Sequence, residues 1–321
     1  MSGVSEIRVI VNPHARRNRG RDGEVVEAFR RVVGDQGQVH TCGDAESLQA
    51  AMVASRDAGA SVLAICGGDG TNGIVIGAAE AAFGAEAIPR IALLRGGTMN
   101  TTATGLGAPR GGPLERLRTV VADLRDQREL AVVRRPLLRG GERLGHLFGT
   151  GLVVSYLEEY YARGRPHPTP WTAFTTLMST AGSAAIRGPL IRRMVSRERL
   201  EVTIDGELIP TDGYLTVTAG TVPQMGLGFA PFHRCAEDPE RFHVLGITVS
   251  ATAFLRDLFR FRTGRGLLPH HGFSRLAKEV VLRPAEGTED LGVMMDGDAM
   301  RAPAPFTLSL GPTVDVIVGA R

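Results

Sequence analysis

Lysine is almost absent from this chain. Among its 37 lysine and arginine residues there is a single lysine, Lys278. It follows Ala277 and so cannot complete the Gly-Lys-Ser/Thr that a P-loop needs. A protein kinase needs a strand lysine close to its glycine-rich loop, and none is present. The sequence therefore excludes both of these large classes of nucleotide-binding protein.

Cysteine is also scarce, and long apolar runs are missing. Cys42, Cys66 and Cys235 lie far apart in the sequence and form neither a disulfide framework nor a CxxC metal site. The chain starts without a signal-peptide pattern, and no run approaches the roughly 20 apolar residues of a spanning helix. We therefore expect a protein of the reducing cytoplasm. A net charge of only +3 gives no reason to expect a nucleic-acid partner.

Residues 1–127 alternate apolar runs of strand length with segments of helical periodicity. This alternation predicts an α/β domain with a parallel sheet and helices on both faces. Ligands are expected at the carboxyl ends of its strands. The expected strands are residues 7–12, 38–42, 61–66 and 90–94, and the expected helices are residues 22–33, 45–58, 71–83 and 113–126.

From residue 128 onward, many short apolar runs are separated by Gly and Pro turns. This pattern predicts an antiparallel β-sandwich over residues 128–310. Two helical segments interrupt it, an insertion at 155–197 and a short helix at 252–262. The expected strands are residues 130–138, 144–154, 200–204, 207–209, 214–218, 242–250, 279–282, 291–295, 306–310 and 314–318.

The segment Gly67–Gly73 joins the third expected strand to the next helix. Its glycines let the backbone approach a ligand and direct N–H groups at it, and the helix N-terminus favours an anion. Asp69, the one acid there, is suited to holding a metal ion or accepting a proton. Gly68, Gly70 and Gly73 also match GxGxxG, so a dinucleotide site is a rival hypothesis. A turn without a ligand is the simplest alternative.

A second loop, Leu93–Asn100, repeats this arrangement one strand later. Gly96, Gly97 and Thr98 follow the strand. Thr98 alone could serve only as a helix cap. Two such loops on neighbouring strands, however, can hold one nucleotide from both sides. We therefore expect a nucleotide phosphate site.

These motifs carry a resemblance to a known family. Val11-Asn12-Pro13, Gly67-Gly68-Asp69-Gly70-Thr71 and Gly97-Thr98-Met99-Asn100 occur in order at the spacing of the diacylglycerol kinase catalytic domain. That family includes bacterial diacylglycerol kinases and the sphingosine and ceramide kinases, and it is distantly similar to NAD kinases. The resemblance implies that a segment near 311–321 completes the α/β domain. It also implies an ATP site lined by Asn12, Pro13, His14, Ala15, Arg16, Thr41, Gly67, Gly68, Asp69, Gly70, Thr71, Asn72, Gly73, Gly97, Thr98 and Asn100.

The family's late motif, Asp-Gly-Glu, carries the acid that is thought to deprotonate the lipid hydroxyl. The matching stretch here is Asp296-Gly297-Asp298, which points to Asp298 as the base, with Asp296 and Asp69 as further catalytic candidates. Asp for Glu shortens the reach by one methylene. The alternative is that Asp-Gly only forms a hairpin turn. A competing match, Asp205-Gly206-Glu207, is interpreted as an ordinary hairpin because it comes too early in the chain.

Two other positions depart from the family pattern. Thr101 stands where the family often has an acid, and residues 236–243 lack the usual Asp-Gly of a structural metal loop. Asp238 and Glu240 could supply oxygens there, but the broken pattern leads us to assign no metal ligands.

The resemblance implies a kinase that uses ATP and Mg²⁺ to phosphorylate the primary hydroxyl of diacylglycerol, ceramide or a sphingoid base. We expect it to contact a membrane surface peripherally, through Trp171–Met178 or Phe254–Leu268. Arginines accompany these segments, namely Arg187, Arg192, Arg193, Arg197, Arg199, Arg256, Arg260, Arg262 and Arg265. The alternatives are an NAD kinase, against which the apolar insertion argues, and a lipid-binding protein without catalysis. Which lipid is used, and whether the chain forms a homodimer, stay open.

Overall fold

The computed structural model describes residues 6–20, 22–164, 169–186, 188–194, 199–284 and 288–320. The chain divides into two compact units. One comprises the residues up to Leu137 together with those from Pro312 onward, and the other comprises Leu138–Gly311. Each unit is described by itself.

The first unit is built on a parallel sheet in the order β2-β1-β3-β4-β16. The strands are β1 (Ile7–Val11), β2 (Gly37–Thr41), β3 (Val62–Cys66) and β4 (Arg90–Leu93), and the end of β16 (Phe306–Ala320) adds to β4 through Val316 and Ile91. Val11 lies opposite both Thr41 and Cys66. The carboxyl ends of these strands therefore meet at one edge, as the predicted α/β fold requires.

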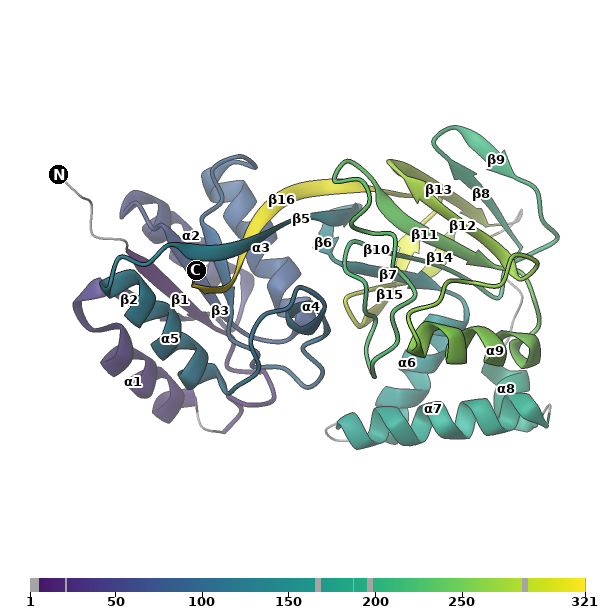
Figure 1. Cartoon of the computed structure of the whole chain (residues 1–321), viewed down its shortest axis with the longest axis horizontal. Helices are drawn as coiled ribbons and strands as arrows, with labels where there is room; N and C mark the ends of the chain where they lie inside the picture. The colour runs from purple at the N-terminus through teal and green to yellow at the C-terminus, as the bar shows by residue number, and fades with distance from the viewer. Residues whose placement is uncertain are drawn as a thin grey trace. The chain divides into compact units, whose positions relative to one another are not determined.

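Helices cover this sheet. They are α1 (Asp22–Val33), α2 (Ala45–Asp57), α3 (Asp69–Phe83), the short α4 (Thr101–Gly105) and α5 (Pro113–Arg125), with a 3₁₀ turn at Gly34–Gln36. Alternate strand residues pack with α1 and α5, which lie side by side (Figure 1). Helices α2 and α3 contact each other and bury their own apolar stripes. Burial of strand residues on both sides explains why β3 is a continuous apolar run and why Arg8 alone interrupts the apolar run of β1.

The second unit is an antiparallel β-sandwich. One sheet has the order β12-β11-β10-β7-β14-β15. The other layer consists of β6, β8, β9, β13, the end of β5 and the start of β16. Their bounds are β5 (Leu130–Gly140), β6 (Arg143–Gly145), β7 (Leu147–Thr150), β8 (Leu200–Ile204), β9 (Glu207–Ile209), β10 (Thr216–Gly220), β11 (Phe242–Ile247), β12 (Gly272–Ala277), β13 (Glu279–Pro284), β14 (Asp290–Met295) and β15 (Asp298–Pro303).

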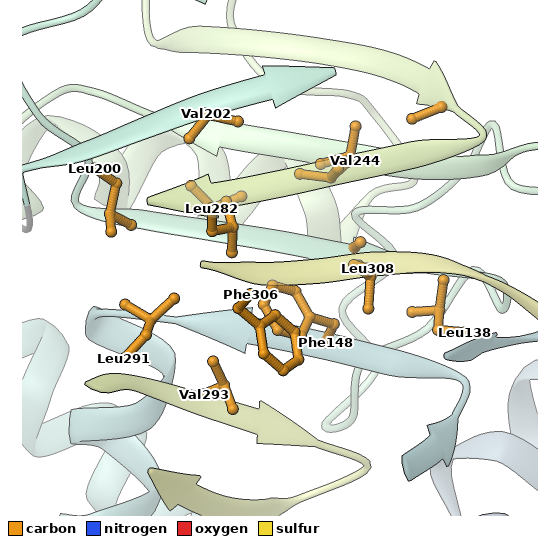
Figure 2. Packing of buried hydrophobic residues seen from close by; sticks show 14 of the residues in the cluster. Leu138, Phe148, Leu200, Val202, Val244, Leu282, Leu291, Val293, Phe306 and Leu308 are labelled. Carbon is orange, nitrogen blue, oxygen red and sulfur yellow. The ribbon is translucent and has the colours of Figure 1, made fainter. Parts of the chain in front are cut away.

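An apolar core fills the sandwich. Figure 2 shows Phe148 of β7 against Phe306 of β16, whose rings stack with centroids 5.5 Å apart. Val202, Leu282 and Val293 belong to the same buried cluster. Each comes from a strand on which buried and exposed side chains alternate or which is buried throughout. The core thus follows from the period-two pattern of these runs.

Four helices belong to the second unit: α6 (Leu152–Arg163), α7 (Pro170–Ala185), α8 (Pro189–Met194) and α9 (Ala251–Arg262). Helix α6 contacts strands β7, β10, β14 and β15, whereas α7 packs on α6, α8 and α9 (Figure 1). Residues 165–168, 187 and 195–197 of the predicted 155–197 insertion lie outside the described residues. None of the helices within the described ranges has the length and hydropathy needed to cross a membrane.

Three expectations for this unit are wrong in detail. A strand over 144–154 is replaced by β6, β7 and the start of α6, because Gly151 turns the chain with φ of 56°. The expected strands 306–310 and 314–318 are one strand, β16. Strands β12 and β15 were not predicted at all.

Candidate active site

The loop after β1 is joined to the beginning of α3. The Asn12 amide nitrogen Nδ2 donates to Thr71 Oγ1 over 2.8 Å, and Asn12 Oδ1 accepts from the backbone N–H of His14 over 2.9 Å. Ala15 is buried, whereas His14 and Arg16 are exposed. Thr41 is exposed at the end of β2, the strand beside β1. The structure therefore brings the predicted residues of the first loop, Thr41 and Thr71 to one edge of the sheet.

The predicted glycine turn is shorter than expected, because α3 begins at Asp69 instead of Thr71. The first hydrogen bond across its start runs from Asn72 N to Gly68 O, 3.1 Å. The backbone N–H groups from Asp69 to Thr71 consequently have no acceptor within the helix. Asn72 and Gly73 are buried in the body of α3. The backbone N–H groups suited to meet an anion are thus those of the partly exposed Asp69, Gly70 and Thr71.

The two glycine loops touch through their backbones. A Cβ on Gly97 would lie 2.4 Å from Gly68 Cα, and a Cβ on Gly67 would lie 2.3 Å from the Thr71 side chain. Only glycine allows such contacts. Asn100, with φ of 50°, closes the second loop by accepting from Gly97 N at 3.0 Å and donating to Gly97 O at 3.1 Å. Thr98 is partly exposed between them.

The Asp69 carboxylate, in the first glycine loop, accepts hydrogen bonds from backbone N–H groups that follow the second loop. Its Oδ2 accepts from Thr101 N and its Oδ1 from Thr102 N, each at 2.9 Å, so the carboxylate caps the N-terminus of α4. Burial raises the pKa of Asp69, and these two hydrogen bonds oppose that rise. Each oxygen keeps a further lone pair that could meet a metal ion or a hydroxyl. The amides of Thr101 and Thr102 were not predicted, because nothing in the sequence relates them to Asp69.

Arg95 is a second residue that the sequence analysis did not assign to the site. It precedes Gly96-Gly97 with φ of 60° and donates to Thr104 Oγ1 over 2.8 Å and to Ala108 O over 3.3 Å. Its charge also opposes the rise in the pKa of Asp69 that burial causes. A guanidinium fixed in this way can form charge-assisted hydrogen bonds with a phosphate. In the sequence, the position of Arg95 between an apolar strand and two glycines was the feature that could have marked it as a site residue.

In the second unit, Asp296-Gly297 is the two-residue turn of the β14–β15 hairpin, with φ of 46° and 92°. Asp296 is buried, and its Oδ1 accepts from His146 N and Leu147 N, each at 2.9 Å. Asp205-Gly206 forms the same kind of turn between β8 and β9. The Asp-Gly pair is therefore a hairpin turn in both places, which leaves Asp298 as the more accessible acid.

Asp298 is the first residue of β15 and is about half exposed. Its Oδ2 lies 3.9 Å from Arg143 Nη1. Partial burial raises the pKa of Asp298, and the Arg143 charge opposes this. The Tyr161 hydroxyl donates to Gly297 O over 3.0 Å, which attaches α6 to the turn. Burial, followed by the nearby charges of Asp298 and Tyr160, raises the pKa of Tyr161 to about 12.

Metal ligands are not assembled by the part of the chain that the structure describes, which contains no group of three His, Cys, Asp or Glu residues able to hold an ion. In the 236–243 loop, Asp238 pairs with Arg241 at 3.4 Å and Glu240 with Lys278 at 3.3 Å. These carboxylates are engaged in ion pairs.

Comparison with known proteins decides the family. Residues 6–133, which contain both glycine loops, match the model of the diacylglycerol kinase catalytic domain. The first domain is a diacylglycerol kinase catalytic domain. A comparison with curated proteins finds no match.

Solved structures agree with this diacylglycerol kinase fold over the whole chain. A protein of Bacillus anthracis str. Sterne, provisionally described as a diacylglycerol kinase, is 16% identical with a TM-score of 0.70, and 99% of each chain is covered. A diacylglycerol kinase from the same organism is 14% identical with a TM-score of 0.64, covering 99% of this chain and 98% of the other. Yeast NADH kinase complexed with NADH is 10% identical with a TM-score of 0.50, covering 100% and 85%. These structures share the fold of the whole chain, and the family match of residues 6–133 supports a kinase of the diacylglycerol kinase and NAD kinase type.

Proposed function

We propose that this kinase transfers the γ-phosphoryl group of ATP to the primary hydroxyl of a lipid of the diacylglycerol, ceramide or sphingoid class. The observation that carries the proposal is the family match of residues 6–133, in which the two matched glycine loops are packed together at Gly68 and Gly97. We further propose that it works in the cytoplasm, at the surface of a membrane.

The residues of the first unit fit a nucleotide triphosphate. The N–H groups at the start of α3 have no helical acceptor and would be able to bind a phosphate, and Arg95 would add a fixed positive charge. Asn12 holds the loop that would contact the adenosine, with Thr41 at its side. Bound Mg²⁺ would neutralise charge on the phosphates, and Asp69 is the carboxylate in this unit placed to orient it. Phosphoryl transfer depends mainly on such positioning.

Asp298 is the residue that we propose as the general base. The lipid hydroxyl gives its proton to the Asp298 carboxylate while its oxygen forms a bond to the γ-phosphorus. The bond from that phosphorus to the bridging oxygen breaks, and ADP leaves. Asp298 is accessible and near Arg143, whereas Asp296 holds the turn through two backbone amides. Asp298 is one methylene shorter than the Glu of the family motif, so the lipid must approach closer than it would to Glu.

The test uses purified protein, γ-labelled ATP and separate reactions with diacylglycerol, ceramide, sphingosine, monoacylglycerol and NAD. We expect label in one or more of the lipids and none in NAD. The lipid with the highest kcat/KM identifies the substrate class. Labelling of NAD alone would replace the proposal with an NAD kinase, and labelling of nothing, with ATP bound, would favour a lipid-binding protein without catalysis.

A further inference from the structure

Helix α7 has an apolar outer face. Trp171, Phe174 and Met178 recur at helical spacing and are 70%, 44% and 54% exposed, and Ile186, directly after the helix, is 80% exposed. The opposite stripe, Ala173, Thr176, Thr180 and Ala184, is buried. Soluble helices normally present charged residues on the outer face. The sequence of α7, residues 170–185, contains no charged residue.

The outer face is rigidly held by its neighbours in the second unit. Tyr156 of α6 donates its hydroxyl to Ala173 O over 2.8 Å, and Thr252 of α9 donates to Ala184 O over 2.8 Å. The rings of Trp171 and Phe174 stack with centroids 5.5 Å apart. Figure 1 shows α7 on the side of α6, α8 and α9 that is remote from the sheets. The exposed side chains therefore form a preformed patch, which we name the α7 face.

Two of the three helices that pack on α7, namely α8 and α9, are basic, whereas α6 carries Glu158 and Glu159. Arg192 of α8 and Arg256 and Arg262 of α9 are exposed. The one acid in these two helices, Asp257, is buried and paired with His271. An uncharged apolar helix with a tryptophan, beside exposed arginines, has the composition of an element that lies in the headgroup region of an anionic membrane.

A second copy of the chain suits this face less well. Complete burial of Trp171, Phe174, Met178 and Ile186 would remove on the order of 500 Å² from water, whereas a stable interface needs about 800 Å² on each partner. Charge argues in the same direction, because two copies would bring their arginines together. An anionic bilayer offers an apolar region to the exposed side chains of α7 and negative charge to the arginines.

We propose that the α7 face is the surface by which this protein docks on anionic lipid bilayers, with Trp171, Phe174 and Met178 entering the headgroup region. The choice of a bilayer as partner rests on the proposed lipid kinase function. Of the two membrane-contact segments expected from the sequence, the proposal favours Trp171–Met178 over Phe254–Leu268. In Phe254–Leu268, Phe254 is buried, Arg260 donates to Gly266 O and Arg262 to Leu227 O. These three residues of Phe254–Leu268 therefore make contacts within the protein, which leaves less of that segment to contact a bilayer.

Trp171 is the only tryptophan in the chain, so its fluorescence reports on the α7 face directly. The full-length protein is mixed, without ATP, with vesicles of phosphatidylcholine containing phosphatidylglycerol, or of phosphatidylcholine alone. We expect a blue-shifted emission and quenching by brominated lipid with the anionic vesicles, weakening as salt rises. Unchanged emission in protein that floats with the vesicles would place the contact elsewhere and overturn the proposal. So would absence of flotation.

The matched variants are Phe174→Gln with Met178→Gln on the α7 face, and Leu208→Gln, an equally exposed apolar residue of β9. The double variant should lower vesicle partitioning by on the order of 10-fold to 10²-fold, and Leu208→Gln should leave it unchanged. Equal partitioning of all three proteins contradicts the proposal. A wild-type dimer in analytical ultracentrifugation that the double variant abolishes would also overturn it in favour of a second copy.

Failure of docking and failure of the kinase function are distinguishable. Phosphorylation of a lipid in detergent micelles, with no vesicle binding, would remove the α7 proposal alone. Vesicle binding through Trp171, with no lipid phosphorylated, would remove the proposed function alone.

Discussion

Replacing Gly97 with alanine should separate the two glycine loops of the nucleotide site. The new Cβ would lie 2.4 Å from Gly68 Cα and 3.3 Å from Gly68 N. Because an ordinary contact begins at 3.4 Å, the two backbones must part by about 1 Å, the difference between 3.4 Å and 2.4 Å. Neither partner is a flexible side chain that could turn away.

The substitution should lower both the stability of the protein and the rate of phosphoryl transfer. Overpacking of this kind costs about 1–3 kcal/mol, and roughly 2–4 °C of Tm accompanies each kcal/mol in a domain of this size. A shift of about 1 Å in groups that position a reacting phosphate lowers the rate about 10²-fold. We therefore expect Gly97→Ala to unfold a few to about 10 °C earlier and to turn over about 10²-fold more slowly per folded molecule.

Circular dichroism on heating and phosphoryl transfer from labelled ATP measure the two effects. Gly23→Ala in α1 is the control, because nothing lies within 4 Å of the added Cβ. It should be neutral or more stable by up to about 1 kcal/mol, the helix propensity difference. A Gly97→Ala protein with the Tm and turnover of the wild type would refute the close packing of the loops.

Four further predictions concern charged or titratable groups. Asp69→Asn should abolish transfer and also lower stability by about 1–3 kcal/mol, because its amide NH₂ cannot accept from the backbone N–H group it would face at α4; near wild-type turnover at saturating ATP and Mg²⁺ would remove Asp69 from the mechanism. Asp298→Asn should lower kcat by on the order of 10²–10⁴ with little change in ATP affinity. Because the Arg143 charge holds the pKa of Asp298 down, Arg143→Gln should move the acid limb of the kcat/KM profile to higher pH, and an unmoved limb would argue against Asp298 as the base. Burial, followed by the nearby His233 and Arg234, lowers the pKa of His243 to about 3. The contribution of His243 to stability is therefore present above its unfolded pKa near 6.5 and is lost as pH falls toward 3. His243→Gln should flatten the dependence of Tm on pH in that window, and an unchanged slope would contradict the assignment.

The sequence predicted the α/β sheet well because its central strands, β1, β3 and β4, are short, mostly apolar and largely buried. The family assignment and the two-part fold are likewise confirmed. The predicted start of α3 was wrong, because three glycines within five residues resemble a loop. In the structure, the packing of Gly67 on Thr71 and the hydrogen bonds of Asp69 to α4 fix the helix instead.

Other errors have similar long-range causes. The apolar run 144–154 does not reveal that β7 ends at Thr150, because Leu152–Val154 would suit a strand or a helix equally. Strand β15 has weak β-forming residues and exists because it pairs with β14 through the Asp296-Gly297 turn. The partners of Asp69 lie 32 and 33 residues away in the sequence, and no local pattern could relate them.

The most direct test of the account is a competition for one phosphoryl group. The purified protein is given γ-labelled ATP and Mg²⁺ with mixed micelles of diacylglycerol, ceramide and sphingosine and an equal concentration of NAD, and the products are separated into organic and aqueous phases. The account predicts label in a phosphorylated lipid in the organic phase, lost in Asp298→Asn. Label confined to phosphorylated NAD in the aqueous phase would contradict it.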